Sequence, residues 1–361
     1  MKITQLSAGR DRSVVLASDG KAYGWGSVKL LGAVLPPGYP GELCTSSATE
    51  IGHNRFAQPV AQWLNPGTPF ASVADGYIDT LGVCRAGTVH SCRPVVSSEG
   101  GAEMSPVAGL PPFAVQMVLT ESAGFALYAD GKVWSWGLPA YGQLGRPGTG
   151  SHQAPAVVAG LPPITALASG NSHLLALDRS GRVWTWGANA AGQLGNGTLA
   201  ESARPVHVVT QVPMAKVAAG DTHSLTVDKL GRLWAWGSNN FGQLGDAKAA
   251  YLTAPTRIKT GFPVQQVDAG MFYTVATSTQ GDVFTWGWNG MGQLGHAELK
   301  STATPQRVRQ LSNVTHITAG VGHVLVLGST GLHAWGDNRA SACGQFPSVT
   351  VQAAPVAVQL A

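Results

Sequence analysis

The sequence predicts an all-β chain folded as a seven-bladed β-propeller. The first observation is the tetrapeptide Gly-Gln-Leu-Gly, which recurs at intervals of 50 residues, at 142–145, 192–195, 242–245 and 292–295. The second is the composition: 12% of residues are charged, and 47 Gly and 11 Trp indicate short strands joined by tight turns. A fixed period of this length is typical of one supersecondary unit repeated in an array.

The clearest copy of the unit, residues 217–258, predicts four strands. A first strand ends at Gly220, and a hairpin turn at 228–231 joins the second strand to the third. The fourth strand, at 253–258, contains a proline that only an outer strand tolerates. The third strand, 232–236, carries apolar side chains on both faces, so the small sheet must be covered on both sides. Sheets stacked around an axis provide that cover.

Seven repeats are counted from paired glycines, one at the end of the first strand and one in the hairpin. The pairs are Gly9 and Gly20, Gly76 and Gly87, Thr120 (in place of Gly) and Gly131, Gly170 and Gly181, Gly220 and Gly231, Gly270 and Gly281, and Gly320 and Gly331. We therefore expect one propeller domain over residues 1–361.

Three repeats depart from the pattern. Repeat 1 carries roughly 17 extra residues within 27–69, a candidate contact arm. Repeat 2, near 70–107, lacks both the tryptophan pair and the tetrapeptide. Repeat 7 has Gly344-Gln345-Phe346 where the tetrapeptide is expected.

The charge and hydropathy patterns argue against several classes of partner. The net charge is +4 and the basic residues are scattered, so we expect no nucleic-acid partner. There is no apolar run of about 20 residues, so we expect no membrane span. The first residues lack the apolar stretch of a signal peptide, which favours a cytoplasmic protein. We also expect a monomer.

The four cysteines do not form an obvious disulfide framework. The repeat register places Cys84 and Cys92 at different heights of neighbouring strands, too far apart for a bridge. Cys44 and Cys343 could meet only if the first and last repeats touch, and this pairing stays open.

The repeat resembles that of the RCC1 (regulator of chromosome condensation 1) family. Residues 219–245 contain Ala-Gly-x-x-His followed by Trp-Gly-x-Asn-x-x-Gly-Gln-Leu-Gly, and the resemblance covers nearly the whole chain, weakly in repeat 2. Kelch propellers have a similar period, but their Gly-Gly doublet is missing here. The resemblance implies a seven-bladed propeller. Family functions include nucleotide exchange on a small GTPase, light sensing through clustered tryptophans, inhibition of a partner enzyme and general interaction scaffolds.

The light-sensing branch has Trp directly after the first-strand glycine, and this chain has none there. In exchange factors of the family, the loop after the first strand contacts the GTPase. The resemblance therefore implies a first set of partner-binding candidates on this loop face: Arg12, Asp79, His173, His223, Phe272, Tyr273 and His323. Two structural alternatives stay open. Each histidine could tie down the bend after the glycine, and Arg12 could form a salt bridge with Asp79.

A second set of candidates precedes or lies within the tetrapeptide loops. Tyr141, Phe241, Trp288 and Met291 are large apolar residues at variable loop positions, as is typical of interaction hot spots. The alternative is packing between adjacent loops. The glutamine of each tetrapeptide is expected to hold its loop backbone through the side-chain amide.

No sequence motif requires catalysis. There is no nucleophile elbow, phosphate-binding Gly-rich loop or metalloprotease motif. We therefore expect no cofactor or metal. The first hypothesis is a propeller that binds another protein through one loop face. The alternatives are an exchange factor for a small GTPase and an enzyme with a pocket at the axial mouth.

Overall fold

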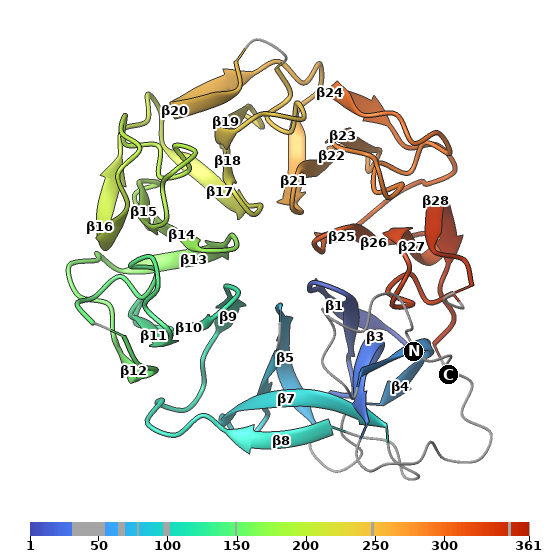
Figure 1. Cartoon of the computed structure of the whole chain (residues 1–361), viewed down its shortest axis with the longest axis horizontal. Helices are drawn as coiled ribbons and strands as arrows, with labels where there is room; N and C mark the ends of the chain where they lie inside the picture. The colour runs from blue at the N-terminus through green and yellow to red at the C-terminus, as the bar shows by residue number, and fades with distance from the viewer. Residues whose placement is uncertain are drawn as a thin grey trace.

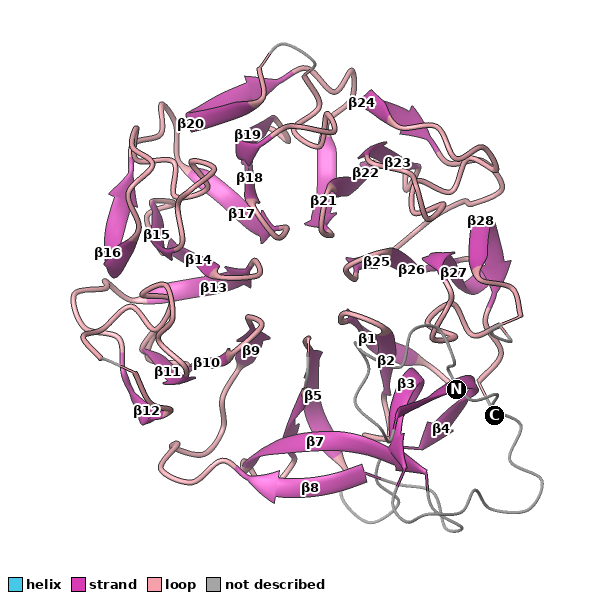
Figure 2. Cartoon of the chain, in the orientation of Figure 1, coloured by secondary structure: helices cyan, strands magenta, loops and turns pink. Residues whose placement is uncertain are grey.

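The computed structural model describes residues 1–30, 55–63, 69–77, 79–96, 102–148, 150–246, 249–345 and 348–360. These residues form 28 strands arranged in seven blades around a central axis, as Figures 1 and 2 show. The described part of the chain contains no helix, and so none that could cross a membrane. The predicted all-β seven-bladed propeller is confirmed.

Blade 5 shows the unit that the sequence predicts. Its strands are β17 (Met214–Ala219), β18 (His223–Asp228), β19 (Leu233–Ser238) and β20 (Tyr251–Ile258), paired antiparallel in that order. β17 lies next to the axis and β20 at the rim (Figure 1). The observed bounds differ from the expected ones by a few residues at the strand ends.

Four other blades repeat this order as separate sheets. Blade 3 contains β9 (Gln116–Leu119), β10 (Ala123–Leu127), β11 (Val133–Gly137) and β12 (Gln153–Val157); blade 4 contains β13 (Ile164–Ser169), β14 (His173–Asp178), β15 (Val183–Gly187) and β16 (Ser202–Val208). Blade 6 contains β21 (Val264–Ala269), β22 (Tyr273–Ser278), β23 (Val283–Gly287) and β24 (Thr302–Arg307); blade 7 contains β25 (His316–Ala319), β26 (His323–Gly328), β27 (Gly331–Asp337) and β28 (Val351–Ala357).

Blades 1 and 2 are joined into one eight-stranded sheet. Blade 1 contains β1 (Ile3–Ala8), β2 (Arg12–Ala17), β3 (Ala22–Leu30) and β4 (Arg55–Trp63); blade 2 contains β5 (Phe70–Asp75), β6 (Thr80–Cys84), β7 (Val89–Val96) and β8 (Ala102–Pro106). The junction is a short parallel pairing of Lys29 with Val95 and of Leu30 with Val96. Within 27–69, β4 is the regular fourth strand of blade 1, and residues 31–54 and 64–68 lie outside the described residues.

In five blades, a third-strand tryptophan donates a hydrogen bond to the blade before it. In β19, residues 233–236 are all buried, which confirms that both faces of the strand are covered. The indole Nε1 of Trp236 donates to the carbonyl oxygen of Gln193 in blade 4 at 2.8 Å. Trp186, Trp286 and Trp335 make the equivalent bond to the preceding tetrapeptide loop. A buried indole ring whose N–H has a hydrogen-bond acceptor stabilises the contact between two sheets.

The ring closes by the same contacts. Trp25 of blade 1 donates to the carbonyl oxygen of Ala342 in blade 7 at 2.9 Å. The amide of Val321 donates to the carbonyl oxygen of Gly9 at 3.0 Å. Blade 1 is built from the first strands of the chain and blade 7 from the last, and the two blades share no strand. The junction therefore depends on packing and hydrogen bonds between them.

The last tetrapeptide position is corrected by the structure. The amide of Cys343 donates to the Oδ1 atom of Asn338 at 3.0 Å, as the leucines of blades 4, 5 and 6 do to their loop asparagines. Residues 341–344 therefore take the place of the tetrapeptide in blade 7, whereas the sequence pattern predicts Gly344-Gln345-Phe346 in this place. Cys343, in the leucine position, is a free buried thiol, and Cys44 lies outside the described residues.

Strand register agrees with the expectation for the remaining cysteine pair. Cys92 lies opposite Thr80, whereas Cys84 lies opposite Phe70, so the two cysteines are not cross-strand neighbours. Cys84 is a free buried thiol.

Candidate functional site

The loop face is the edge of the propeller formed by two loops of each blade: first strand to second, and third strand to fourth. Both kinds of loop reach the same edge because adjacent strands are antiparallel. In blade 5 their described residues are 220–222, 239–246 and 249–250. Both sets of predicted partner-binding residues belong to these loops or to the strand ends beside them.

The three histidines of the first set are fully buried and connect neighbouring blades. Their Nε2 atoms lie 2.9, 3.1 and 3.0 Å from hydroxyl oxygens of the next blade, in the pairs His173 with Ser224, His223 with Thr274, and His323 with Ser13. Each hydroxyl donates in turn to a carbonyl oxygen in the tetrapeptide loop of the histidine's own blade. The histidines therefore have a structural role, as in the alternative that each imidazole holds the bend after the glycine, and the contact also joins two blades.

Burial lowers the pKa of these histidines. The pKa falls from 6.5 to about 3 for His173 and His223, and to about 4 for His323, because the charged imidazolium would lose its hydration. The histidines are therefore neutral near pH 7. A neutral imidazole can hydrogen-bond through Nε2 as acceptor or donor.

Tyr273 and Arg12 occupy the same register and make the same junction with other chemistry. The hydroxyl oxygen of Tyr273 lies 2.9 and 2.7 Å from the carbonyl oxygens of Gly320 and His323 in blade 7. Arg12 forms a buried ion pair with Asp75 of blade 2, with 2.8 Å between Nη2 and Oδ1. The expected partner of Arg12, Asp79, instead accepts from Ser91 at 3.1 Å and is half-buried.

Burial corrects one expectation about the first set. His173, His223, Tyr273 and His323 have no exposed surface and Arg12 only 4%, so these side chains lie behind the loop face and do not form it. Position in the repeat does not show whether a side chain points outward from the bend or packs against the next blade. Asp79 and Phe272 are the members of this set with partly exposed surface.

The tetrapeptide loops have a rigid backbone. As predicted, the Oε1 atom of each tetrapeptide glutamine accepts a hydrogen bond from the backbone amide two residues earlier. The amide of Phe241, for example, donates to Gln243 at 2.9 Å. The loop asparagine, which sequence reasoning did not single out, adds two bonds. In blade 5, Asn239 accepts from the amide of Leu244 at 3.0 Å and donates to the carbonyl oxygen of Ala249 at 2.8 Å. The residue before the tetrapeptide therefore has a fixed position.

Three predicted residues from the two sets meet in an aromatic cluster on the loop face, made of Phe241, Phe272 and Trp288. The ring centroids of Phe241 and Phe272 lie 5.0 Å apart, and Trp288 lies 6.2 Å from each. Phe241 belongs to blade 5 and the other two belong to blade 6. Phe241 is 40% exposed, whereas Phe272 and Trp288 are half-buried. Each aromatic pair in such a contact contributes about 1 kcal/mol to stability.

The other two members of the second set lie at the equivalent loop position in other blades. Tyr141 of blade 3 is 50% exposed and Met291 of blade 6 is half-buried. Their backbone amides are held by Gln143 and Gln293 at 2.7 and 2.9 Å.

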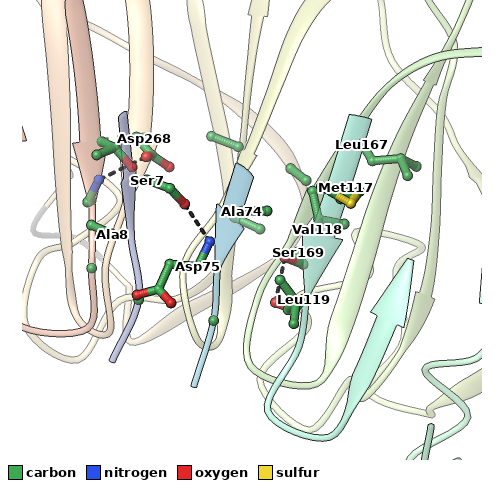
Figure 3. Close-up of a pocket in the computed structure, with 18 of the residues that line it drawn as sticks. Ser7, Ala8, Ala74, Asp75, Met117, Val118, Leu119, Leu167, Ser169 and Asp268 are labelled. Atoms are coloured by element: carbon green, nitrogen blue, oxygen red, sulfur yellow. Dashed lines mark hydrogen bonds between the residues drawn. The ribbon is translucent and has the colours of Figure 1, made fainter. Parts of the chain in front are cut away.

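A cavity of about 580 Å³ occupies the axis of the ring, lined by the innermost strands of all seven blades. Figure 3 shows Asp75 and Asp268 beside it. The carboxylate of Asp268 accepts from the amides of Ala269 and Ala319, each at 2.9 Å. Burial nevertheless raises the pKa of Asp268 to about 6.

One side-chain contact crosses the axial cavity at the loop face. The hydroxyl of Tyr77, in blade 2, donates to the Oδ1 atom of Asp221 in blade 5. Burial raises the pKa of Asp221 to about 6. Both residues directly follow a first-strand glycine, where the light-sensing branch of the family has tryptophan, and sequence reasoning did not single them out. Within the described residues, no group of three His, Cys, Asp or Glu side chains could hold a metal ion.

Comparisons with known proteins agree with this geometry. A family model described as RCC1-like domain matches residues 38–361, and a model of the Regulator of chromosome condensation (RCC1) repeat matches residues 3–27. The chain belongs to the RCC1-like family. No curated protein sequence matches this RCC1-like chain.

Solved structures show the same fold. Human WBSCR16 is similar over 94% of each chain, with 24% identity and a TM-score of 0.78. Prp20p from Saccharomyces cerevisiae, reported with its binding properties to Gsp1p and histones, is similar over 88% of this chain and 80% of its own, with 19% identity and a TM-score of 0.73. The ectodomain of the Arabidopsis thaliana receptor kinase ACR4 has 17% identity over 92% of this chain and 93% of its own, with a TM-score of 0.51.

Proposed function

We propose that this RCC1-like propeller is a protein-interaction module that binds another protein through its loop face, with the aromatic cluster at the centre of the contact. The observation that carries the proposal is the contact of Phe241, Phe272 and Trp288 on that face, with Phe241 40% exposed. Aromatic side chains near the centre of an interface commonly supply most of its binding energy.

The position of the cluster distinguishes it from the tryptophans of the blade cores. Trp186, Trp236 and Trp286 are fully buried, and each indole N–H already has an acceptor. Trp288 is half-buried, and Phe241 exposes a large apolar ring at the end of a loop. The contact of these rings joins blades 5 and 6, and the exposed part of Phe241 remains as apolar surface for a partner.

The rigidity of the loops also supports the proposal. Gln243 and Asn239 fix the backbone on both sides of Phe241 before any partner arrives. Binding to a preorganised surface avoids part of the entropy cost of ordering a loop. Tyr141, exposed at the same loop position of blade 3, is a candidate for a second contact. Asp79 and Met291, both half-buried, are further candidates.

The test is photo-crosslinking from single positions. A photoreactive phenylalanine analogue is placed at Phe241 and, as a control, at Leu230, which is 70% exposed in the hairpin turn at the opposite edge of blade 5. We expect one stoichiometric protein adduct from position 241 and none from position 230. The adduct should be lost when Trp288→Ala is added. Equal labelling from both positions would contradict a loop-face site.

Nucleotide exchange on a small GTPase is a narrower form of this function. Prp20p is reported to bind Gsp1p and has the same fold. The test is release of a fluorescent nucleotide from a panel of small GTPases, with the chain and with its Asp79→Ala variant. Acceleration that Asp79→Ala removes would support exchange, and unchanged release across the panel would reject it. Rejection would leave the general interaction function intact.

A further inference from the structure

A groove of about 680 Å³ lies at the rim between blades 6 and 7. One wall is the loop of residues 295–301 and the outer strand β24, and the other includes Ala354 and Pro355 of β28. The loop wall belongs to the loop face, but the groove contains no residue of the aromatic cluster, so the two sites are distinct.

The groove has an excess of basic side chains. Lys300, Arg307 and Arg309 line it, with one acidic residue, Glu298. Arg307 pairs with Asp282 at 2.5 Å. Lys300 and Arg309 are exposed, and among the described residues neither has a carboxylate within ion-pair distance. Two cations without partners on one concave surface attract a negatively charged group.

The loop wall of the groove is held in place from both sides. The amide of Ala297 donates to the carbonyl oxygen of Ala353 in β28 at 2.8 Å. The half-buried His296 lies 2.9 Å through its Nε2 atom from the Oγ1 atom of Thr285 in β23. Ala297 has a φ of 63°, and the equivalent position in blade 4 is Gly197 with a φ of 81°. These two contacts hold the loop in place although Ala297 has a backbone conformation that favours glycine.

A second hollow lies against the same backbone segment as the groove. A hollow of about 460 Å³ is lined by residues 306–311, and Gln306, Arg307, Arg309 and Gln310 line both spaces. A single small anion could fill only one of them. A ligand that contacts Lys300 in one space and extends beyond Arg309 into the other must be a chain.

Blade 6 has basic residues at both unpaired positions, whereas blades 4 and 5 do not. The residue equivalent to Lys300 is Ala200 in blade 4 and Ala250 in blade 5. The residue equivalent to Arg309 is Val209 in blade 4 and Lys259 in blade 5. The combination is therefore a property of this blade and not of the repeat.

We propose that this groove binds an acidic peptide segment of a partner protein in an extended conformation. Carboxylate groups of the peptide would pair with Lys300 and with the guanidinium of Arg309, whose planar fork suits a carboxylate. The peptide backbone would follow the rim between β24 and β28.

The experiment measures fluorescence anisotropy of a labelled peptide of alternating Glu and Ser against the full chain at low salt. The neutral probe has Gln in place of each Glu. The test variant is Lys300→Glu with Arg309→Glu. The matched control is Arg257→Glu with Lys259→Glu, which changes the net charge equally at exposed positions on blade 5.

We expect the wild-type chain to bind the Glu peptide and not the Gln peptide. The blade 6 variant should weaken binding about tenfold or more, and the blade 5 variant by about twofold at most. Phe241→Ala should leave peptide binding unchanged, which separates this site from the loop face. No binding by the wild-type chain, or equal loss in both double variants, would overturn the proposal. Displacement by inorganic phosphate but not by chloride of equal ionic strength would also overturn it, in favour of a small-anion site.

Discussion

Acid should destabilise this propeller through its buried histidines. His173, His223 and His323 are neutral in the folded chain, with pKa values of about 3, 3 and 4, and return to about 6.5 on unfolding. The unfolded chain therefore binds more protons below pH 6.5. The stability that these groups contribute is complete above pH 6.5 and is lost as the pH falls toward the folded-state pKa values.

The size of the effect follows from the pKa values. At pH 5 each histidine reduces the free energy of unfolding by about 2 kcal/mol, or about 6 kcal/mol for the three. Asp221 and Asp268 act in the opposite direction, since burial raises their pKa values from 3.8 to about 6. Their protonation regains about 3 kcal/mol at pH 5. The net loss between pH 7.5 and pH 5 is thus about 3 kcal/mol.

The variant His223→Tyr isolates one histidine. The chain itself has Tyr273 at this register in blade 6, where the hydroxyl bonds to the next blade. Thr274, the partner of His223, keeps its bond to the carbonyl oxygen of Gln243 at 2.8 Å. We expect the loss between pH 7.5 and pH 5 to shrink by about 2 kcal/mol, with His152→Tyr at an exposed site as the control.

The assay is urea denaturation followed by tryptophan fluorescence at several pH values. The free energy of unfolding is compared between the wild-type chain, His223→Tyr and His152→Tyr. If His223→Tyr loses as much stability on acidification as the wild-type chain, the buried histidines are not the cause.

Four further variants test the junctions and the loop face. Arg12→Met leaves Asp75 as an unpaired buried carboxylate and should cost about 4 kcal/mol in chemical denaturation, and adding Asp75→Asn should restore part of it. Gly220→Ala places a methyl group 2.3 Å from the carbonyl oxygen of Gly270 and should cost about 3 kcal/mol. Gly261→Ala, with open space around it, should cost only about 1 kcal/mol for its positive φ. Trp288→Ala should weaken binding of the crosslinked partner by about 2 kcal/mol or more in a titration, with an unchanged Kd counting against the aromatic cluster.

The periodic part of this molecule could be predicted from sequence because its information is local. The spacing of Gly220, Gly231 and Trp236 identifies two strand ends and a hairpin, and apolar residues on both faces of 233–236 require neighbouring sheets. Counting such units then gave the seven blades. The glutamine bonds were also predictable, because the side-chain amide of Gln243 needs only its own loop.

The site was harder to predict because its contacts cross from one blade to the next. Tyr77 and Asp221 lie 144 residues apart and meet only across the closed ring. Arg12 pairs with Asp75. Asp75 ends β5 and Asp79 precedes β6, and repeat register alone does not resolve which of the two carboxylates faces Arg12 in blade 1. Phe241, Phe272 and Trp288 were singled out one by one, but their contact depends on how blades 5 and 6 pack.

Hydrogen–deuterium exchange of the chain alone and with the partner captured at position 241 tests the central claim most directly. Added protection is expected in residues 238–245, 270–274 and 287–291, which carry the aromatic cluster, with no change in the hairpin turn at 228–231. Protection confined to the hairpin turns, with the loop face unchanged, would contradict the assignment of the interaction site.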